Sequence, residues 1–180
     1  FMASHSNIVI LDCGSQYTQL IARRIRELQV RSEILPWDSS EEAILARAPK
    51  GIIISGGPRS VLEEDAPTIP DGILHSGIPI LGICYGMQLL AHRLEGTVMQ
   101  APLAEYGPAE VRVLDFESPL LKGLPEVLSV WMSHWDSVTS LPAGCHAIAE
   151  SGGGLIAGFA DEASRITGLQ FHPEVAHTPR

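Results

Sequence analysis

The chain has 180 residues, enough for a single α/β domain that buries roughly 70% of its unfolded surface. Hydrophobic residues make up 45% of it and charged residues 18%, a composition typical of globular rather than disordered proteins. Twelve Lys and Arg against 21 Asp and Glu give a formal net charge of −9, which argues against nucleic acid or an anionic membrane as a partner.

The sequence predicts a protein of the reducing cytoplasm. No apolar run approaches the roughly 18 residues that a membrane span needs, and the N-terminus lacks the pattern of a signal peptide. Cys13, Cys84 and Cys145 are widely spaced and form no CxxC pair, so neither a disulfide framework nor a metal site is expected. Residue Phe1 precedes a methionine, so residues 1–6 are interpreted as a tag remnant and N-terminal tail, and residues 7–180 as one domain.

Strands and helices are expected to alternate through the first half of the chain. Short apolar runs predict buried strands, and Tyr17, Leu20, Ile21 and Ile25 recur at helical spacing after Ser15, a candidate helix cap. The predicted strands are 7–13, 30–35, 51–55 and 78–83, and the predicted helices are 17–28, 40–48, 73–76 and 85–94. This alternation is typical of a parallel sheet with helices on both faces.

After Gly96 the pattern changes to strands joined by turns rich in proline and glycine. The predicted strands are 109–114, 127–132, 146–150, 155–159 and 167–171. We expect them to extend the same sheet as antiparallel strands. The predicted fold class is therefore α/β, with an open, mixed, mainly parallel sheet and no internal domain boundary.

One segment predicts a nucleophile. Gly82-Ile83-Cys84-Tyr85-Gly86 stands between a predicted buried strand and a predicted helix, which is the thiol version of a nucleophile elbow. A tight turn of this kind presents the central side chain above the sheet edge and places it at a helix N-terminus, where the dipole favours thiolate. The backbone N–H of Tyr85 is then available to an oxyanion. The alternative is a small apolar residue in the core, which is how we interpret Cys13 and Cys145.

A cysteine nucleophile needs a base with an orienting group, and His172 is the best placed of seven histidines. It follows the last predicted strand directly, and strand ends are where sites assemble in open α/β sheets. Two residues later, the carboxylate of Glu174 could bond the imidazole and hold its tautomer. His177, three residues from the end of the chain, is expected to be mobile.

Several motifs together resemble class I glutamine amidotransferases of the Cys-His-Glu type, whose fold is flavodoxin-like. These are the segments 82–88 and 171–175, and the finer match is to the amidotransferase domains of the GMP synthetase family. That finer match rests on residues 10–24, 55–61, 105–107, 131–134 and 177–180. Trp135 departs from the pattern, because glycine usually stands there.

The resemblance implies a role for each matching residue. Cys84 would attack the side-chain amide of glutamine to give a γ-glutamyl thioester and ammonia, with His172 as base and then acid and Glu174 as the orienting carboxylate. Backbone N–H groups of Gly57 and Tyr85 would form the oxyanion hole. Gln88, Ser133 and His134 match the residues that contact the substrate glutamine.

The resemblance also implies a partner. In GMP synthetases the ammonia converts XMP to GMP in a separate ATP pyrophosphatase domain, which needs ATP and magnesium and is absent from this chain. That domain would lie in the same polypeptide or in a separate one, and a homodimer is one expected form of the full-length enzyme. No cofactor is expected in this domain.

Two other interpretations stay open at this stage. The first is the amidotransferase component of another pathway, such as anthranilate or carbamoyl-phosphate synthesis, against which the opening Asp12-Cys13-Gly14-Ser15-Gln16-Tyr17 speaks. The second is a non-catalytic regulatory module, which would normally have lost one of Cys84, His172 or Glu174.

Overall fold

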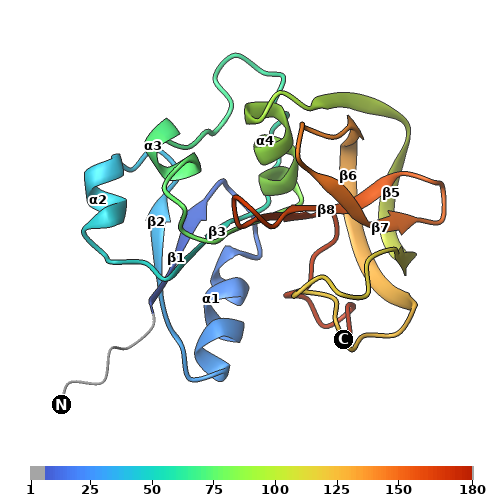
Figure 1. Ribbon diagram of the computed structural model, residues 1–180, viewed down its shortest axis with the longest axis horizontal. Helices are drawn as coiled ribbons and strands as arrows, with labels where there is room; N and C mark the ends of the chain where they lie inside the picture. Colours follow the sequence, from blue (N-terminus) through green and yellow to red (C-terminus); the bar gives the residue numbers. More distant parts are fainter. Residues whose placement is uncertain (1–6, 180) are drawn as a thin grey trace.

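The computed structural model describes residues 7–179, so the tail expected over residues 1–6 lies outside the described residues (Figure 1). Thirteen elements follow one another along this part of the chain. They are β1 Asn7–Asp12, α1 Thr18–Glu27, β2 Arg31–Pro36, α2 Glu41–Leu45, β3 Gly51–Ile54, α3 Asp71–Leu74, β4 Ile80–Ile83, α4 Tyr85–Arg93, β5 Thr97–Val113, β6 Val127–Ser140, β7 His146–Ser151, β8 Ile156–Asp161 and β9 Ile166–Leu169.

All nine strands form a single mixed sheet in the order β2-β1-β3-β4-β9-β8-β7-β5-β6. The first five strands of that order are parallel to one another, and every pairing from β9 onward is antiparallel. The last strand of the chain therefore joins the two halves, because β9 pairs with β4 on one side and with β8 on the other. The expected antiparallel extension is confirmed for β5 to β8, whereas the prediction was wrong for β9, which pairs parallel with β4 and continues the parallel half.

Helices cover both faces of the parallel half, as predicted (Figure 1). Alternate residues of β1 point to opposite faces, so Val9 packs with Ile44 of α2, Ile73 of α3 and Leu90 of α4. The next residue, Ile10, packs with α1 on the other face.

Ser40 caps α2 through its side chain, whereas Ser15 is not the cap of α1, because the helix begins after Tyr17. Ser15 Oγ instead accepts a hydrogen bond from Tyr17 N at 3.0 Å.

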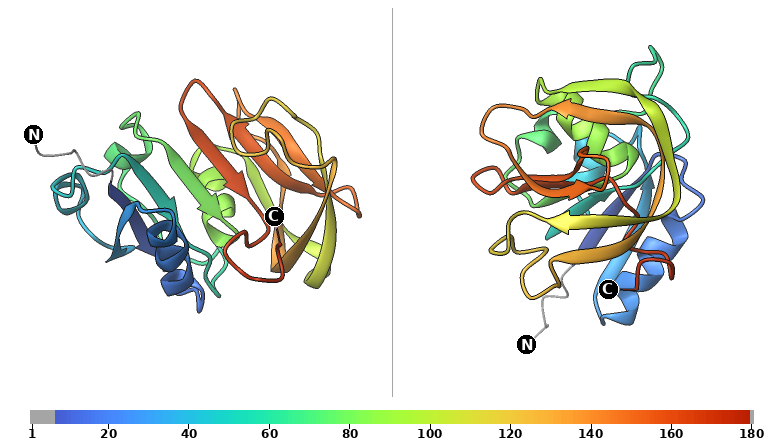
Figure 2. Two further views of the ribbon diagram at one scale, coloured as in Figure 1. Left: turned by 90° about the horizontal axis from the view of Figure 1, so that it is seen from below. Right: turned by 90° about the vertical axis from the view of Figure 1, so that its right-hand side faces the viewer.

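The antiparallel half is built on β5 and β6, which form a long curved pair (Figure 2). Both are longer than the sequence predicts, since β5 begins at Thr97 and β6 continues to Ser140. A register shift between Gln100 and Glu105 bends β5. A second core lies in this half and includes Val111 of β5, Val130 of β6 and Ile148 of β7.

The strand β9 ends at Leu169, so the predicted strand 167–171 is shifted. Phe171 and His172 lie in the turn beyond its carboxyl end, close to the end of β4 that leads into α4. No helix among residues 7–179 has both the length and the apolar character needed to cross a membrane.

Candidate active site

Cys84 occupies a strained turn between β4 and α4. Its φ of 54° and ψ of −107° are a conformation that L residues rarely adopt, and it is the N-cap of α4. Close packing holds it there, because a Cβ on Gly86 would lie 2.3 Å from the carbonyl oxygen of Ile54. A Cβ on Gly82 would lie 2.4 Å from the backbone of Gly86. The turn therefore has the geometry expected of a nucleophile elbow.

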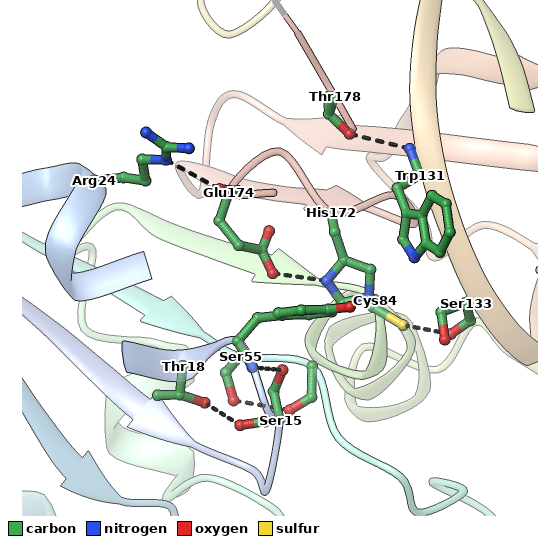
Figure 3. A network of polar contacts seen from close by, with 12 residues as sticks. Ser15, Thr18, Arg24, Ser55, Cys84, Trp131, Ser133, His172, Glu174 and Thr178 are labelled. Carbon is green, nitrogen blue, oxygen red and sulfur yellow. Dashed lines mark hydrogen bonds and ion pairs between the residues drawn. The ribbon is translucent and has the colours of Figure 1, made fainter. Parts of the chain in front are cut away.

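The structure brings His172 and Glu174 to this thiol, and the three side chains are buried (Figure 3). His172 Nδ1 lies 2.7 Å from Glu174 Oε1, and the backbone N–H of His172 donates to the carbonyl of Trp131 at 3.1 Å. Burial alone would lower the pKa of His172, but hydrogen bonds and charge from Cys84 and Glu174 outweigh it and raise the pKa to about 10. The arrangement favours the imidazolium form beside the thiol.

Further contacts fix this group in place. The ring of Tyr17 packs edge-on against that of His172, with centroids 5.4 Å apart. Arg24 Nε donates to the backbone carbonyl of Glu174 at 3.1 Å. The second carboxylate oxygen of Glu174 has no partner among residues 7–179, so its negative charge is directed mainly at the imidazole. His177, expected to be mobile, packs against Trp131 with ring centroids 4.7 Å apart.

Two residues beside the thiol have backbone N–H groups without a carbonyl partner among the described residues. Those of Gly57 and Tyr85 donate to no carbonyl among residues 7–179, and both residues line a cavity next to Cys84. A Cβ on Gly57 would lie 2.3 Å from the carbonyl oxygen of Cys13, so only glycine fits there. The placement is suitable for an oxyanion hole.

Two cavities meet at Cys84. The first, called here the His172 cavity, measures about 280 Å³ and is lined by residues 14–17, Gly57, Pro58, Cys84, Ser133 and His172. The second, called here the Gln88 cavity, measures about 440 Å³ and is large enough for an amino acid. It is lined by residues 57–60, Glu63, 84–85, Gln88, Tyr106 and 133–136.

Two hydrogen bonds hold the side-chain amide of Gln88, which lines the Gln88 cavity. Its Nε2 donates to the carbonyl of Asp136 at 2.9 Å and to Gln170 Oε1 at 3.2 Å, which uses both of its protons. The amide is thereby oriented, and Oε1 is left as an acceptor for a ligand. At the mouth of the cavity, exposed Trp135 packs edge-on against Tyr106 with centroids 5.7 Å apart.

Ser133 and His134 differ in what they can offer. Ser133 lines both cavities, and its backbone carbonyl accepts a hydrogen bond from the Cys84 thiol, with Sγ and O 3.4 Å apart. The ring of His134 is committed elsewhere, because Nδ1 lies 2.8 Å from the carbonyl of Asp136 and Nε2 lies 2.7 Å from Glu105 Oε2. The ring of His134 is therefore not available to a substrate, although the residue lines the Gln88 cavity.

Asp136 and Glu105 were not predicted as site residues. Glu105 stands in a recognised motif, but only the pairing of β5 with β6 shows that it faces His134. Asp136 has no sequence signal, since its role rests on its backbone carbonyl and on a hydrogen bond from Ser60 to its carboxylate.

The other two cysteines do not share this environment. Burial and the charge of Asp12 raise the pKa of Cys13 to about 12, and burial and Asp161 raise that of Cys145 to about 11. Of the described residues, only Asp115, His146 and Glu162 could offer three ligands to a metal ion, and none of them lines either cavity. His146 already bonds Asp115, with Nε2 and Oδ2 2.8 Å apart.

Comparisons with known proteins show the family of this chain. The family model for glutamine amidotransferase class-I matches residues 9–180. Curated relatives include GMP synthases [glutamine-hydrolyzing] from Thermomicrobium roseum, 54% identical over 98% of this chain, and Thermus thermophilus, 51% identical over 96%. The chain spans only about a third of their length, 33% and 34% respectively.

Solved structures share the fold. A candidate GMP synthase component from Thermoplasma acidophilum superposes with a TM-score of 0.84 and is 33% identical, covering 98% of this chain and 88% of that one. A glutamine amidotransferase from Thermotoga maritima, 23% identical, has a TM-score of 0.76 and covers 96% of this chain and 78% of that one. With the family model matched from β1 to the end of the chain, this chain belongs to the class I glutamine amidotransferase family.

Proposed function

We propose that this chain hydrolyses glutamine to glutamate and ammonia through a thioester on Cys84, and that the ammonia is used to make GMP from XMP. The observation that supports it best is the strained Cys84 thiol beside a buried pair of base and carboxylate, His172 and Glu174. Every group that acyl transfer requires is then supplied by one end of the sheet.

In the first half of the reaction, glutamine lies in the Gln88 cavity with its side-chain amide at the thiol. The raised pKa of His172 favours transfer of the thiol proton to its imidazole ahead of the attack, so the sulfur attacks the amide carbon as a thiolate beside an imidazolium. The N–H groups of Gly57 and Tyr85 receive the negative oxygen, and glycine at position 57 permits the close approach. His172 then gives its proton to the amide nitrogen, which leaves as ammonia.

In the second half, water hydrolyses the thioester. Acylation removes the hydrogen bond and the charge of Cys84 from beside His172, and these are two of the causes that raise its pKa. A larger fraction of the imidazole is therefore neutral, and able to accept a proton from water, in the thioester than in the free enzyme, as the role change requires. Glu174 holds Nδ1 throughout, which leaves Nε2 to exchange the proton.

The use of ammonia for GMP synthesis is supported by the relatives. Those that match almost the whole of this chain at 51–54% identity are named GMP synthases, and they are about three times as long. We infer that an ATP pyrophosphatase domain, in the same or a separate polypeptide, consumes the ammonia with ATP and magnesium. The same relatives favour this pathway over anthranilate or carbamoyl-phosphate synthesis.

The test is intact-mass spectrometry after treatment with 6-diazo-5-oxo-L-norleucine, an electrophilic glutamine analogue. We expect one adduct, mapped to Cys84 and prevented by excess glutamine, with glutamate formed from glutamine by the untreated protein. Cys84→Ser should abolish both reactions, whereas Cys13→Ser and Cys145→Ser should keep them, since burial keeps those thiols protonated.

Two results would count against the proposal. Loss of activity in all three cysteine variants would assign the cysteines to folding instead of chemistry. A well-folded wild-type chain that neither reacts with the analogue nor hydrolyses glutamine, even with the ATP pyrophosphatase domain of a GMP synthase added, would favour a regulatory module.

A further inference from the structure

The two cavities beside Cys84 divide the reacting groups between them. The thiol, Gly57 and Ser133 line both, but His172 lines only the smaller cavity and Gln88 only the larger one. The thiol therefore adjoins both the cavity that Gln88 lines and the cavity that the proton-transferring group lines. Residues 14–17 close the His172 side and have no part in the mechanism described so far.

We infer that the His172 cavity is the chamber into which ammonia leaves and from which the hydrolytic water arrives, with residues 14–17 as its outer wall. This inference rests on the proposed glutaminase function. It assigns a route through the protein to the leaving group and to water, and makes Ser15 a residue that sets how large a leaving group can be.

The movement of protons requires this placement. In acylation, the Cys84 S–C bond forms, the amide C–N bond breaks, and the proton that His172 took from the thiol goes to nitrogen. In deacylation, water oxygen bonds the same carbon, the S–C bond breaks, and His172 carries the water proton to the departing sulfur. Both ammonia and water must therefore lie against His172, and of the two cavities described at Cys84 it is the smaller one that His172 lines.

The wall is rigid enough to set the size of this chamber. Asp12 Oδ1 accepts hydrogen bonds from Gly14 N and from Thr18 Oγ1, both at 2.9 Å. Ser15 Oγ bonds Tyr17 N, and the Tyr17 ring supports the His172 ring from the side. The segment thus connects the end of β1 to the base through a chain of fixed contacts.

Ser15 reaches the reacting groups. A Cβ placed on Gly56 would lie 3.1 Å from His172 Cε1, 3.5 Å from Cys84 Cβ and 3.7 Å from Ser15 Oγ. The three side chains therefore lie around Gly56, and all three residues line the His172 cavity. A larger side chain at position 15 would occupy the place of the leaving group without touching the Gln88 cavity.

The experiment compares two substrates, glutamine and γ-glutamyl methylamide, which give the same thioester but release ammonia and methylamine. The ratio of their kcat/KM values therefore isolates departure of the leaving group. We expect Ser15→Leu to lower kcat/KM for the methylamide about tenfold more than for glutamine, because methylamine needs more of the chamber. Ser15→Ala is the matched control: it removes the hydrogen bond to Tyr17 without filling space, and the ratio should stay as in the wild type.

A second control changes the other cavity. Trp135→Ala alters the mouth of the Gln88 cavity, so it should change KM for both substrates equally and leave their ratio unchanged. Gln16→Trp fills the His172 cavity from its exposed rim and should repeat the effect of Ser15→Leu if that variant is unstable. Thermal unfolding of each variant checks that it is folded.

The outcomes separate the two proposals. If the wild type hydrolyses both substrates and the ratio is the same in Ser15→Leu and Gln16→Trp, the chamber is wrong and the glutaminase stands. If Ser15→Ala lowers the ratio as much as Ser15→Leu, the hydrogen bond to Tyr17 matters and not the volume. If the wild type hydrolyses neither substrate, alone or with the ATP pyrophosphatase domain of a GMP synthase added, the proposed function itself fails.

Discussion

At the scale of the residue, the backbone of Cys84 is strained. A residue with a side chain at φ 54° and ψ −107° destabilises the folded state by an amount of order 1–3 kcal/mol. Glycine adopts this conformation, the mirror image of an extended one, without strain. Stability and chemistry therefore oppose each other at this position, and substitutions can measure the two separately.

We expect Cys84→Gly to be more stable than Cys84→Ala by about 1 kcal/mol in urea unfolding, although both lack the thiol. The control is Ala91→Gly in the interior of α4, where the same exchange of alanine for glycine should destabilise by about 1 kcal/mol or more. If glycine is the less stable residue at both positions, the elbow carries no strain.

His172 gives a prediction about pH. Its pKa is raised from 6.5 to about 10, so the contribution of its protonated form to stability is complete below about pH 6.5 and is lost as pH rises toward 10. Glu174→Gln removes one of the causes of this rise. NMR titration of the His172 ring should therefore give a lower pKa in that variant, and its free energy of unfolding should fall less between pH 7 and 10. An unchanged pKa would assign the rise to Cys84 alone.

The sequence predicted the proposed nucleophile, base and carboxylate because each stands in a short segment whose turn geometry is local. Ser15 was expected to cap α1 directly, but the helix begins after Tyr17, and the Ser15 hydroxyl accepts a hydrogen bond from the backbone N–H of Tyr17 instead. The pair of His134 and Glu105 could not be predicted, since 29 residues separate them and only the register of two long strands brings them together.

At the scale of the element, the packing of α4 on β3 and β4 decides whether the elbow can form. Gly86 at the start of the helix lies against the backbone of Ile54 with no room for a methyl group. Backbone atoms cannot turn aside as a flexible side chain can, so the cost of a Cβ here falls on the position of the whole helix.

We expect Gly86→Ala to destabilise the protein by about 3 kcal/mol or to prevent folding. Gly152→Ala is the matched control, because a Cβ there meets nothing within 4 Å and the change should stay within about 0.5 kcal/mol. Urea unfolding of the two variants gives the comparison, and similar stabilities would mean that α4 can shift away from β3 at little cost.

The elements of the parallel half were predicted with small errors in their ends, because buried apolar runs and helical periodicity are strong signals. The start of β5 was missed. Pro102, Gly107 and Pro108 interrupt its sequence, and such residues ordinarily end a strand. Pairing along β6 and a bulge accommodate them, and both depend on contacts distant in the sequence.

At the scale of the whole molecule, β9 joins the parallel and antiparallel halves of the sheet. β4 and β9 pair at Ile80 and Ile166, and β9 also carries the turn that leads to His172. The parallel half is thus incomplete without β9, and the antiparallel half has no other partner in the sheet among residues 7–179. The pairing of β4 with β9 therefore contributes both to the fold and to the position of His172.

We therefore expect one cooperative unfolding transition for the two halves. Trp37 reports on the parallel half, and Trp131 and Trp135 report on the antiparallel half, so single-tryptophan variants with the others changed to phenylalanine can follow each half separately. Their urea midpoints should coincide with each other and with the midpoint from far-UV circular dichroism.

Leu169→Ala, in the strand that both halves share, should lower both midpoints together and reduce the free energy of unfolding by about 2–5 kcal/mol. Two separate midpoints, or a loss confined to one half in Leu169→Ala, would mean that each half is stable without β9.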